Sequence, residues 1–184
     1  LFSDPDIFDF PTAFLWRKHL AHFIAKKRAV RVKKNYTLIG GKSPLTELTQ
    51  QQAIELEKQL RNNGLTASVF VAMRYWHPTI EETVKKIQEG SFQRVLLLPL
   101  YPQFSRATTL SSFNEWDRVV QQYHLQIPTT TICCYPTHPL FIEALVGTIH
   151  TTIQKISVPR PELTILFSAH GIPEHYIRQG DLYQ

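Results

Sequence analysis

Short apolar runs alternate with amphipathic stretches along the chain from residue 44 onward. Apolar and β-branched residues dominate the runs at 67–75, 94–102, 129–136 and 162–168, and we predict a strand in each. The run at 94–102 is almost continuously apolar, which is typical of a strand that is buried on both faces.

Between these runs, apolar residues recur at the spacing of a helix. We expect helices over 44–62, over 79–89, from Ser112 onward and over 139–156. In the segment 79–89, Ile80, Val84 and Ile87 share one stripe. In the segment that begins at Ser112, one stripe contains Phe113, Trp116, Val120 and Tyr123.

Residue types that start helices precede three of these segments. Ser43 stands before a proline and is predicted to cap the helix over 44–62. Thr79 with Glu82, and Ser112 with Glu115, match the capping-box pattern in which two side chains bond the first free amides.

Alternation of strands and helices predicts an α/β fold, with a parallel sheet and right-handed crossovers. Ligands of such sheets bind beyond the carboxyl ends of the strands. Polar and aromatic side chains follow the predicted strand ends, and all of them are candidates for a site at this edge: Arg74, Tyr75 and His77, then Tyr101, Gln103, Ser105 and Arg106, then Tyr135, Thr137 and His138, and last His170.

His170 stands directly after the last predicted strand, in the sequence "LFSAHGIP" of residues 166–173. Gly171 lets a backbone or a ligand approach closely. A neutral imidazole at this edge can take up a proton or bind a metal ion. A structural or merely exposed histidine is the alternative.

Charge is unevenly distributed along this chain of 184 residues, whose composition of 43% hydrophobic and 19% charged residues is globular. Eight of the 20 Lys and Arg residues lie within 17–34, and the net charge is +5. Apolar residues from Phe14 to Ile24 are interspersed among them, so the basic segment 14–34 fits a solvated face, a lipid surface or an anionic ligand better than nucleic acid. No run reaches the ~20 apolar residues of a membrane span.

Common cofactor and metal motifs are incomplete or absent. The stretch "IGGKSP" ends like a phosphate-binding loop, but Tyr36 stands where the leading glycine belongs. Cys133 and Cys134 are adjacent, which excludes the spacing of a zinc site. We expect two small buried thiols in a reducing cytosol.

Five stretches together resemble the ferrochelatase family, whose enzymes insert ferrous iron into a porphyrin to make haem. They are "IGGKSPLTELTQQQA" at 39–53, "MRYWHPTIEET" at 73–83, "LLLPLYPQFSRATTLSSFNE" at 96–115, "YPTHPLFIEA" at 135–144 and "LFSAHGIPEHYIRQGDLY" at 166–183. The resemblance covers essentially the whole chain.

This resemblance implies roles for the candidate residues. His170 matches the histidine that projects into the porphyrin cleft, either as the base for the pyrrole protons or as a transient ligand of the ferrous iron. Arg74 and Tyr75 match a pair near the metal-facing side, and Tyr101, Ser105 and Arg106 match a segment that borders the macrocycle. An arginine suits the anionic propionates of a porphyrin.

The resemblance also implies an architecture: a three-layer parallel sheet with flanking helices, in two flavodoxin-like halves of the chelatase type. We expect 1–108 to be the first α/β domain without its opening strand, and 109–184 to begin the second. The family chain continues past "GDLY" into a part that supplies an acidic residue facing the histidine. Relatives with an iron–sulfur cluster have a cysteine where Arg106 stands, so we expect no cluster and no resident cofactor.

Several alternatives remain open at this point. The porphyrin is protoporphyrin IX or coproporphyrin III. A chelatase that puts cobalt or iron into a reduced tetrapyrrole such as sirohydrochlorin, and a tetrapyrrole-binding module without catalysis, are the competing functions. We expect a cytoplasmic protein, with peripheral membrane contact through 14–34 as one role of the basic segment.

Overall fold

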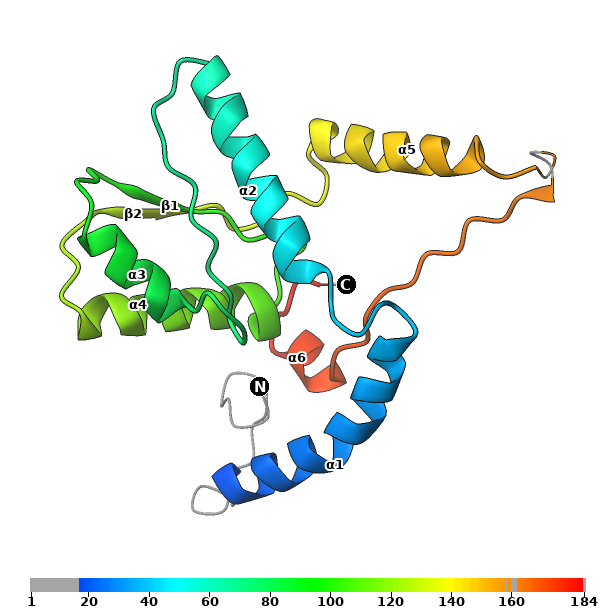
Figure 1. Cartoon of the computed structure of the whole chain (residues 1–184), viewed down its shortest axis with the longest axis horizontal. Coiled ribbons are helices and arrows are strands. Elements are labelled where there is room, and N and C mark those ends of the chain that lie inside the picture. The colour runs from blue at the N-terminus through cyan, green and yellow to red at the C-terminus, as the bar shows by residue number, and fades with distance from the viewer. Residues whose placement is uncertain (1–16, 158, 160–161, 184) are drawn as a thin grey trace. The chain divides into compact units, whose positions relative to one another are not determined.

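The computed structural model describes residues 17–157, 159 and 162–183 (Figure 1). They fall into two compact units. One contains the described residues up to Val95 together with Ser111–Pro128, and the other contains Leu96–Leu110 and the described residues from Thr129 onward. The elements in chain order are α1 (Arg17–Thr37), α2 (Leu45–Asn62), α3 (Ile80–Gln88), β1 (Val95–Leu97), the π-helical turn η1 (Arg106–Leu110), α4 (Ser111–Gln122), β2 (Thr129–Thr131), α5 (Pro139–Ile153) and α6 (Glu174–Arg178).

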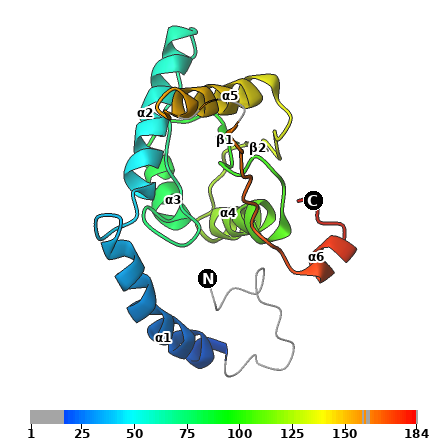
Figure 2. The same ribbon diagram turned by 90° about the vertical axis from the view of Figure 1, so that its right-hand side faces the viewer.

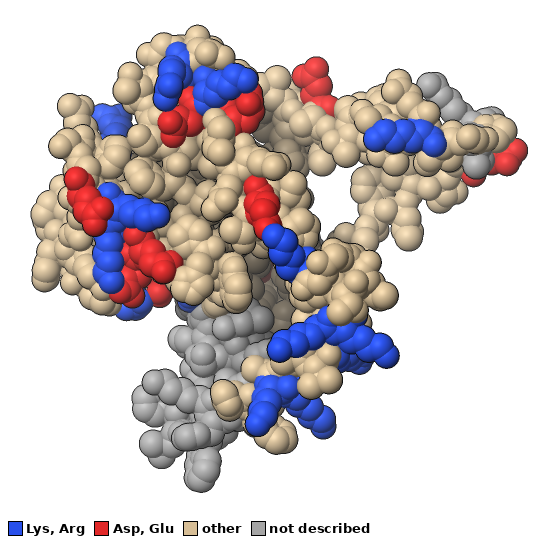
Figure 3. All heavy atoms as spheres, viewed as in Figure 1, with Lys and Arg blue, Asp and Glu red and all other residues tan. Residues whose placement is uncertain are grey.

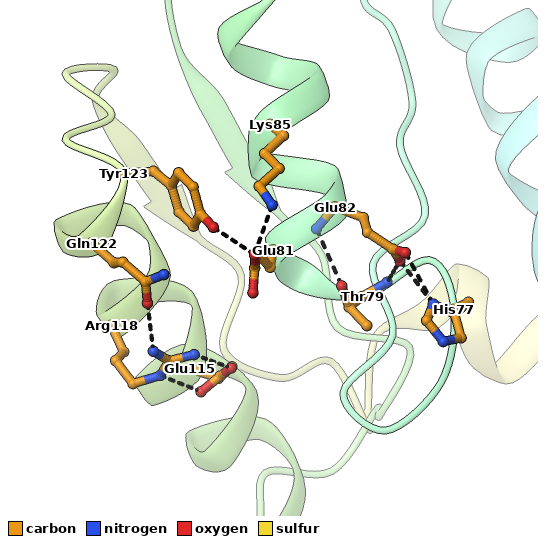
Figure 4. Close-up of polar contacts among 9 residues, drawn as sticks. All are labelled: His77, Thr79, Glu81, Glu82, Lys85, Glu115, Arg118, Gln122 and Tyr123. Carbon is orange, nitrogen blue, oxygen red and sulfur yellow. Dashed lines mark hydrogen bonds and ion pairs between the residues drawn. The ribbon is translucent and has the colours of Figure 1, made fainter.

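The predicted helices over 44–62, 79–89 and 139–156 are confirmed within a few residues by α2, α3 and α5. The capping box of α3 is present in both directions. The Thr79 hydroxyl accepts a hydrogen bond from the Glu82 amide at 3.2 Å, and the Glu82 carboxylate accepts one from the Thr79 amide at 2.6 Å (Figure 4). The prediction that Ser43 caps α2 is wrong, because Pro44 occupies the N-cap position and no side chain caps the helix; the Ser43 hydroxyl, one residue earlier, accepts a hydrogen bond from the Leu45 amide at 3.2 Å.

The capping box predicted at Ser112 is wrong. Ser112 lies inside a helical run, because η1 leads directly into α4. This run begins after Ser105, whose hydroxyl accepts a hydrogen bond from the Ala107 amide at 3.3 Å. Glu115, the other half of the expected box, instead forms a bidentate ion pair with Arg118 (Figure 4).

A small sheet of two strands pairs β1 with β2. The Val95 amide donates to the Pro128 carbonyl and the Ile132 amide to the Leu97 carbonyl, both at 2.9 Å, so the strands are parallel. The expected α/β character is therefore present. The three-layer arrangement stays a prediction, as does the domain boundary at 108/109, which lies within η1.

The strands predicted over 67–75 and 162–168 are wrong for the described residues, which have none there apart from an isolated bridge between Met73 and Thr79. A strand needs a partner that takes up its amides and carbonyls. In 67–75 these groups bond helix side chains instead: the Val69 amide donates to Glu57 and the Val71 carbonyl accepts from Thr83, both at 2.9 Å.

The run at 94–102 is not buried on both faces, contrary to expectation. Leu96 is 58% exposed and Leu100 is 52% exposed. In the described structure β1 has one hydrogen-bonded neighbour, β2, so its side chains are only partly covered.

The core of the first unit lies between α3 and α4, which run side by side (Figures 1 and 2). Val84 of α3 and Val119 of α4 are fully buried, and Trp116 is 3% exposed. The predicted stripe of α3 is confirmed, whereas in α4 the fully buried position is Val119 rather than Val120.

Polar contacts border this core. The Gln88 amide group donates to the Tyr123 carbonyl at 2.6 Å, and the Tyr123 hydroxyl donates to Glu81 (Figure 4). They join the C-terminal end of α4 to α3.

Cys133 and Cys134 follow β2 as free thiols. Both are exposed, so the prediction of buried thiols is wrong. They lie just beyond the short paired part of β2, where no further strand covers them in the described structure. Hydrogen bonding to Cys134 raises the pKa of the Cys133 thiol above its ordinary value.

Candidate functional site

A buried carboxylate joins two distant segments of the second unit. Asp181 is 4% exposed, and its Oδ2 accepts hydrogen bonds from the Ser105 hydroxyl at 3.0 Å and from the Arg106 amide at 2.8 Å. Its Oδ1 accepts one from the Tyr183 amide at 3.0 Å. The partners on the Oδ2 side are 76 and 75 positions away in sequence, so this link is tertiary rather than local.

A tight turn after α6 places Asp181 inside the unit. Gly180 adopts a positive φ of 84°, a conformation that glycine takes without a steric penalty. The Asp181 amide then returns to the Tyr176 carbonyl at 3.0 Å, and Tyr176 is itself buried. The sequence "YIRQGD" thus closes the helix and turns the carboxylate inward.

The Ser105–Arg106 segment meets this carboxylate at the start of a helical run. Ser105 is 2% exposed; its hydroxyl donates to Asp181 and accepts from the Ala107 amide. Two of the amides that a helix leaves unpaired at its N-terminus are thereby bonded. A carboxylate is also electrostatically favoured at this end of a helix.

The Arg106 side chain is half-buried. Within the described residues its guanidinium forms no hydrogen bond or ion pair, so its donors remain available to an anion. The backbone of Arg106 is bonded to Asp181, while its guanidinium has no partner in the described part of the chain. That combination suits a residue that binds the carboxylate of a ligand.

His170 is connected to the same carboxylate through Tyr183. The His170 amide donates to the Tyr183 hydroxyl at 3.3 Å, and the Tyr183 amide donates to Asp181. The His170 residue is exposed, and its imidazole has no hydrogen-bond partner among the described residues. A side chain added at Gly171 would meet no atom within 4 Å, so there is open space next to the histidine.

Three of the sequence-predicted site residues, Ser105, Arg106 and His170, are therefore linked through Asp181 and Tyr183. Tyr101 belongs to the same unit and is 40% exposed. No hydrogen bond joins it to Asp181 or Tyr183 in the described part of the chain.

Arg74 and Tyr75 belong to the first unit, where they gather around Ser111 at the start of α4. The Arg74 Nε donates to the Ser111 carbonyl at 3.2 Å and to its hydroxyl at 3.1 Å. The guanidinium carbon lies 4.7 Å from the centre of the Tyr75 ring, a cation–π contact. The Tyr75 hydroxyl lies 3.5 Å from the Ser111 hydroxyl. The pair is thus held rigidly, with Tyr75 40% exposed.

Sequence reasoning missed Asp181 and Tyr183 as site residues. Both lie in the stretch "GDLY", which contributed to the family resemblance but carried no role of its own. The described residues contain no group of three or more His, Cys, Asp or Glu side chains placed to hold a metal ion together.

Comparison with known proteins gives one consistent match. The family model described as Ferrochelatase matches residues 1–184. Proteins named Ferrochelatase from Pelagibacter ubique and Geobacter metallireducens are 39% identical over 186 residues and 44% identical over 183 residues, covering 100% of this chain and 52% and 56% of those proteins. A Ferrochelatase from Synechococcus sp. (strain JA-2-3B'a(2-13)) is 41% identical over 187 residues, with 100% of this chain and 54% of that protein covered. The chain spans about half the length of the curated relatives that it matches.

Proposed function

The chain belongs to the ferrochelatase family, and we propose that the full-length protein inserts ferrous iron into a porphyrin in haem biosynthesis, with release of two protons. The observation that carries this proposal is the match along all 184 residues. The link between His170 and the Ser105–Arg106 turn supports it, because a proton acceptor and an anion-binding group are held in one unit.

Metal insertion requires a base next to the macrocycle. A free porphyrin carries two pyrrole N–H protons that must leave as the metal enters. Imidazole is the side chain best suited to exchange protons near neutral pH, and the His170 ring is exposed beside open space. We therefore propose His170 as the base, with transient contact to the ferrous iron as its second role.

Charge and apolar surface serve to bind the porphyrin. The free guanidinium of Arg106 is proposed to bind a propionate, and Tyr101 is proposed to line the macrocycle. Ser105 contributes through the turn that it caps, since its hydroxyl donates to Asp181. Arg74 and Tyr75 are proposed to face the metal. Because Arg106 stands where related chains have a cluster cysteine, we expect no iron–sulfur cluster at this position.

The decisive assay uses the full-length protein with ferrous iron under anaerobic conditions. Protoporphyrin IX and coproporphyrin III are supplied in parallel, and insertion is followed by absorbance. We expect turnover with at least one of them. Porphyrin binding without insertion would contradict the proposal and favour a tetrapyrrole-binding module. Activity confined to cobalt and sirohydrochlorin would favour the related chelatase.

We also propose that α1 makes peripheral contact with anionic lipid, in keeping with a cytoplasmic protein. The sequence of α1 contains Lys and Arg but no Asp or Glu, and Lys and Arg side chains gather along this helix (Figure 3). Apolar residues such as Phe23, 66% exposed, lie among them. The basic and apolar residues are not separated into two faces, so the attraction is electrostatic. No helix of the described residues is long and apolar enough to cross a bilayer.

Vesicle sedimentation tests this contact. Each basic residue near an anionic surface contributes about 1 kcal/mol, and salt screens the attraction. Replacing Lys26 and Lys27 with Gln should weaken binding to acidic vesicles, whereas Lys86→Gln in α3 should not. Binding that salt does not reduce, or no binding to acidic vesicles, would contradict the contact.

A further inference from the structure

We propose that Asp181 is a positioning residue of the metal-insertion site, and that it acts on His170 through Tyr183. This inference rests on the proposed function. Asp181 has almost no exposed surface to offer a ligand, since it is 4% exposed and both of its oxygens accept internal hydrogen bonds. Its influence on the reaction is therefore exerted through the groups that it holds.

The groups around Asp181 are all donors. Oδ2 accepts from the Ser105 hydroxyl and the Arg106 amide, and Oδ1 accepts from the Tyr183 amide. An ionised carboxylate is the one side-chain group of this size that accepts on both sides and donates on neither. The residue type is thus matched to its three partners.

Helix capping alone does not account for this arrangement. Ser105 already bonds the Ala107 amide, as an ordinary N-cap serine does. Asp181 also accepts a hydrogen bond from the Tyr183 amide, and the Tyr183 hydroxyl accepts one from the His170 amide at 3.3 Å. The same carboxylate therefore bonds the backbone of Arg106, the residue proposed to bind a propionate, and the backbone of Tyr183, whose hydroxyl in turn bonds the backbone of His170, the proposed base.

Asparagine at this position would separate the two sides. Its amide group has one accepting oxygen and one donating nitrogen. The oxygen is expected to face Ser105 and Arg106, where two donors converge, and the nitrogen would then face the Tyr183 amide, which is also a donor. Asp181→Asn should consequently release the Tyr183–His170 side while the Ser105–Arg106 side stays bonded.

The experiment compares Asp181→Asn, Tyr183→Phe and their combination in the full-length protein. We expect either single change to lower kcat for metal insertion by roughly 10- to 100-fold, the scale of a misplaced catalytic group, while KM for porphyrin changes less than about twofold. The double variant should be no slower than the slower single variant, because both changes release the same group. Tyr123→Phe, which removes a hydroxyl contact with Glu81 in the first unit, is the matched control and should keep wild-type kcat.

Hydrogen exchange provides a readout that does not depend on activity. The peptide that contains His170 should exchange several-fold faster in Asp181→Asn and in Tyr183→Phe than in Tyr123→Phe. If the wild-type protein inserts no metal, the proposed function is refuted, and faster exchange in the two variants then shows a structural link without a role in catalysis. A normal kcat in folded Tyr183→Phe, or rate losses in the two single variants that multiply in the double variant, would overturn the positioning role.

Discussion

The α3–α4 pair of the first unit and the Asp181 link of the second unit are held by different kinds of contact. Between α3 and α4, Val84 and Val119 are fully buried. Polar bonds border this core, among them the one from the Tyr123 hydroxyl to Glu81 (Figure 4). At Asp181 the buried Asp181 and Ser105 side chains are polar and bond to each other, with the buried Tyr176 beside them.

This difference separates stability from positioning. Apolar burial is non-directional and tolerates small shifts, so it stabilises the helix pair without fixing any one atom. A buried carboxylate with three donors is directional, and losing one partner leaves a polar group unpaired at a cost of ~1 to 3 kcal/mol. The candidate site lies where the directional contacts are.

Trp116→Ala, in the apolar core of the first unit, should have the largest effect on the free energy of unfolding. Trp116 is 3% exposed, and removing such a side chain costs about 3 to 5 kcal/mol in the free energy of unfolding. Urea unfolding followed by circular dichroism measures the loss. Trp76→Ala is the control, because Trp76 is 66% exposed. Equal losses in the two variants would show that the helix pair is not the core of the first unit.

Ser105→Ala should show the cost of an incomplete polar link. The variant removes one donor to the buried Asp181 carboxylate and the acceptor of the Ala107 amide, and we expect a loss of about 1 to 3 kcal/mol in unfolding free energy. Thr151→Ala, which removes an exposed bond to the Gly147 carbonyl, should change it by less than about 0.5 kcal/mol. A loss as small as that of the control would mean that the link adds nothing to stability.

Thr79→Ala tests the polar edge of the α3–α4 pair. It deletes the hydroxyl that bonds the Glu82 amide, and capping losses are typically about 1 kcal/mol. Thermal unfolding should detect a lower Tm. Thr49→Ala in α2 removes a hydroxyl that bonds only the Leu45 carbonyl of its own helix, so its Tm should stay close to wild type. An unchanged Tm in Thr79→Ala would show that the Thr79 cap does not stabilise the fold.

The smallest effect expected is a pH dependence at the same cap. Hydrogen bonds from the Thr79 amide and then from His77 lower the pKa of Glu82 below its ordinary value of 4.5. A carboxyl with a lowered pKa stabilises the fold above its ordinary pKa, and this contribution is lost as the pH falls through the folded value. The Tm difference between wild type and Glu82→Gln should therefore shrink between about pH 6 and pH 3. A difference that does not vary with pH would contradict the assignment.

Elements with local signals were predictable from sequence. The Thr79–Glu82 pair and the spacing of Ile80, Val84 and Ile87 define α3 without any distant partner. The runs at 67–75 and 162–168 have strand-like composition, but strand formation depends on a neighbour that sequence pattern does not supply. Local sequence patterns therefore predicted helices better than strands.

The candidate site divides in the same way. His170 and Arg106 were found from sequence because imidazole and guanidinium groups after predicted strands have recognisable chemistry. Asp181 was missed because a charged residue after a glycine is typical of an exposed turn. Its burial depends on Ser105, which is 76 positions away. Long-range polar contacts are the part of a site that local pattern does not reveal.

Single-turnover metal insertion by full-length His170→Ala tests the central claim most directly, namely that this histidine is the base of a metal-insertion site. Porphyrin titration and thermal unfolding of the same variant accompany the measurement. We predict that insertion slows by roughly 100-fold or more, the scale of a positioned proton-transfer group, while the porphyrin still binds and the variant stays folded. Near-normal insertion by folded His170→Ala would contradict the claim.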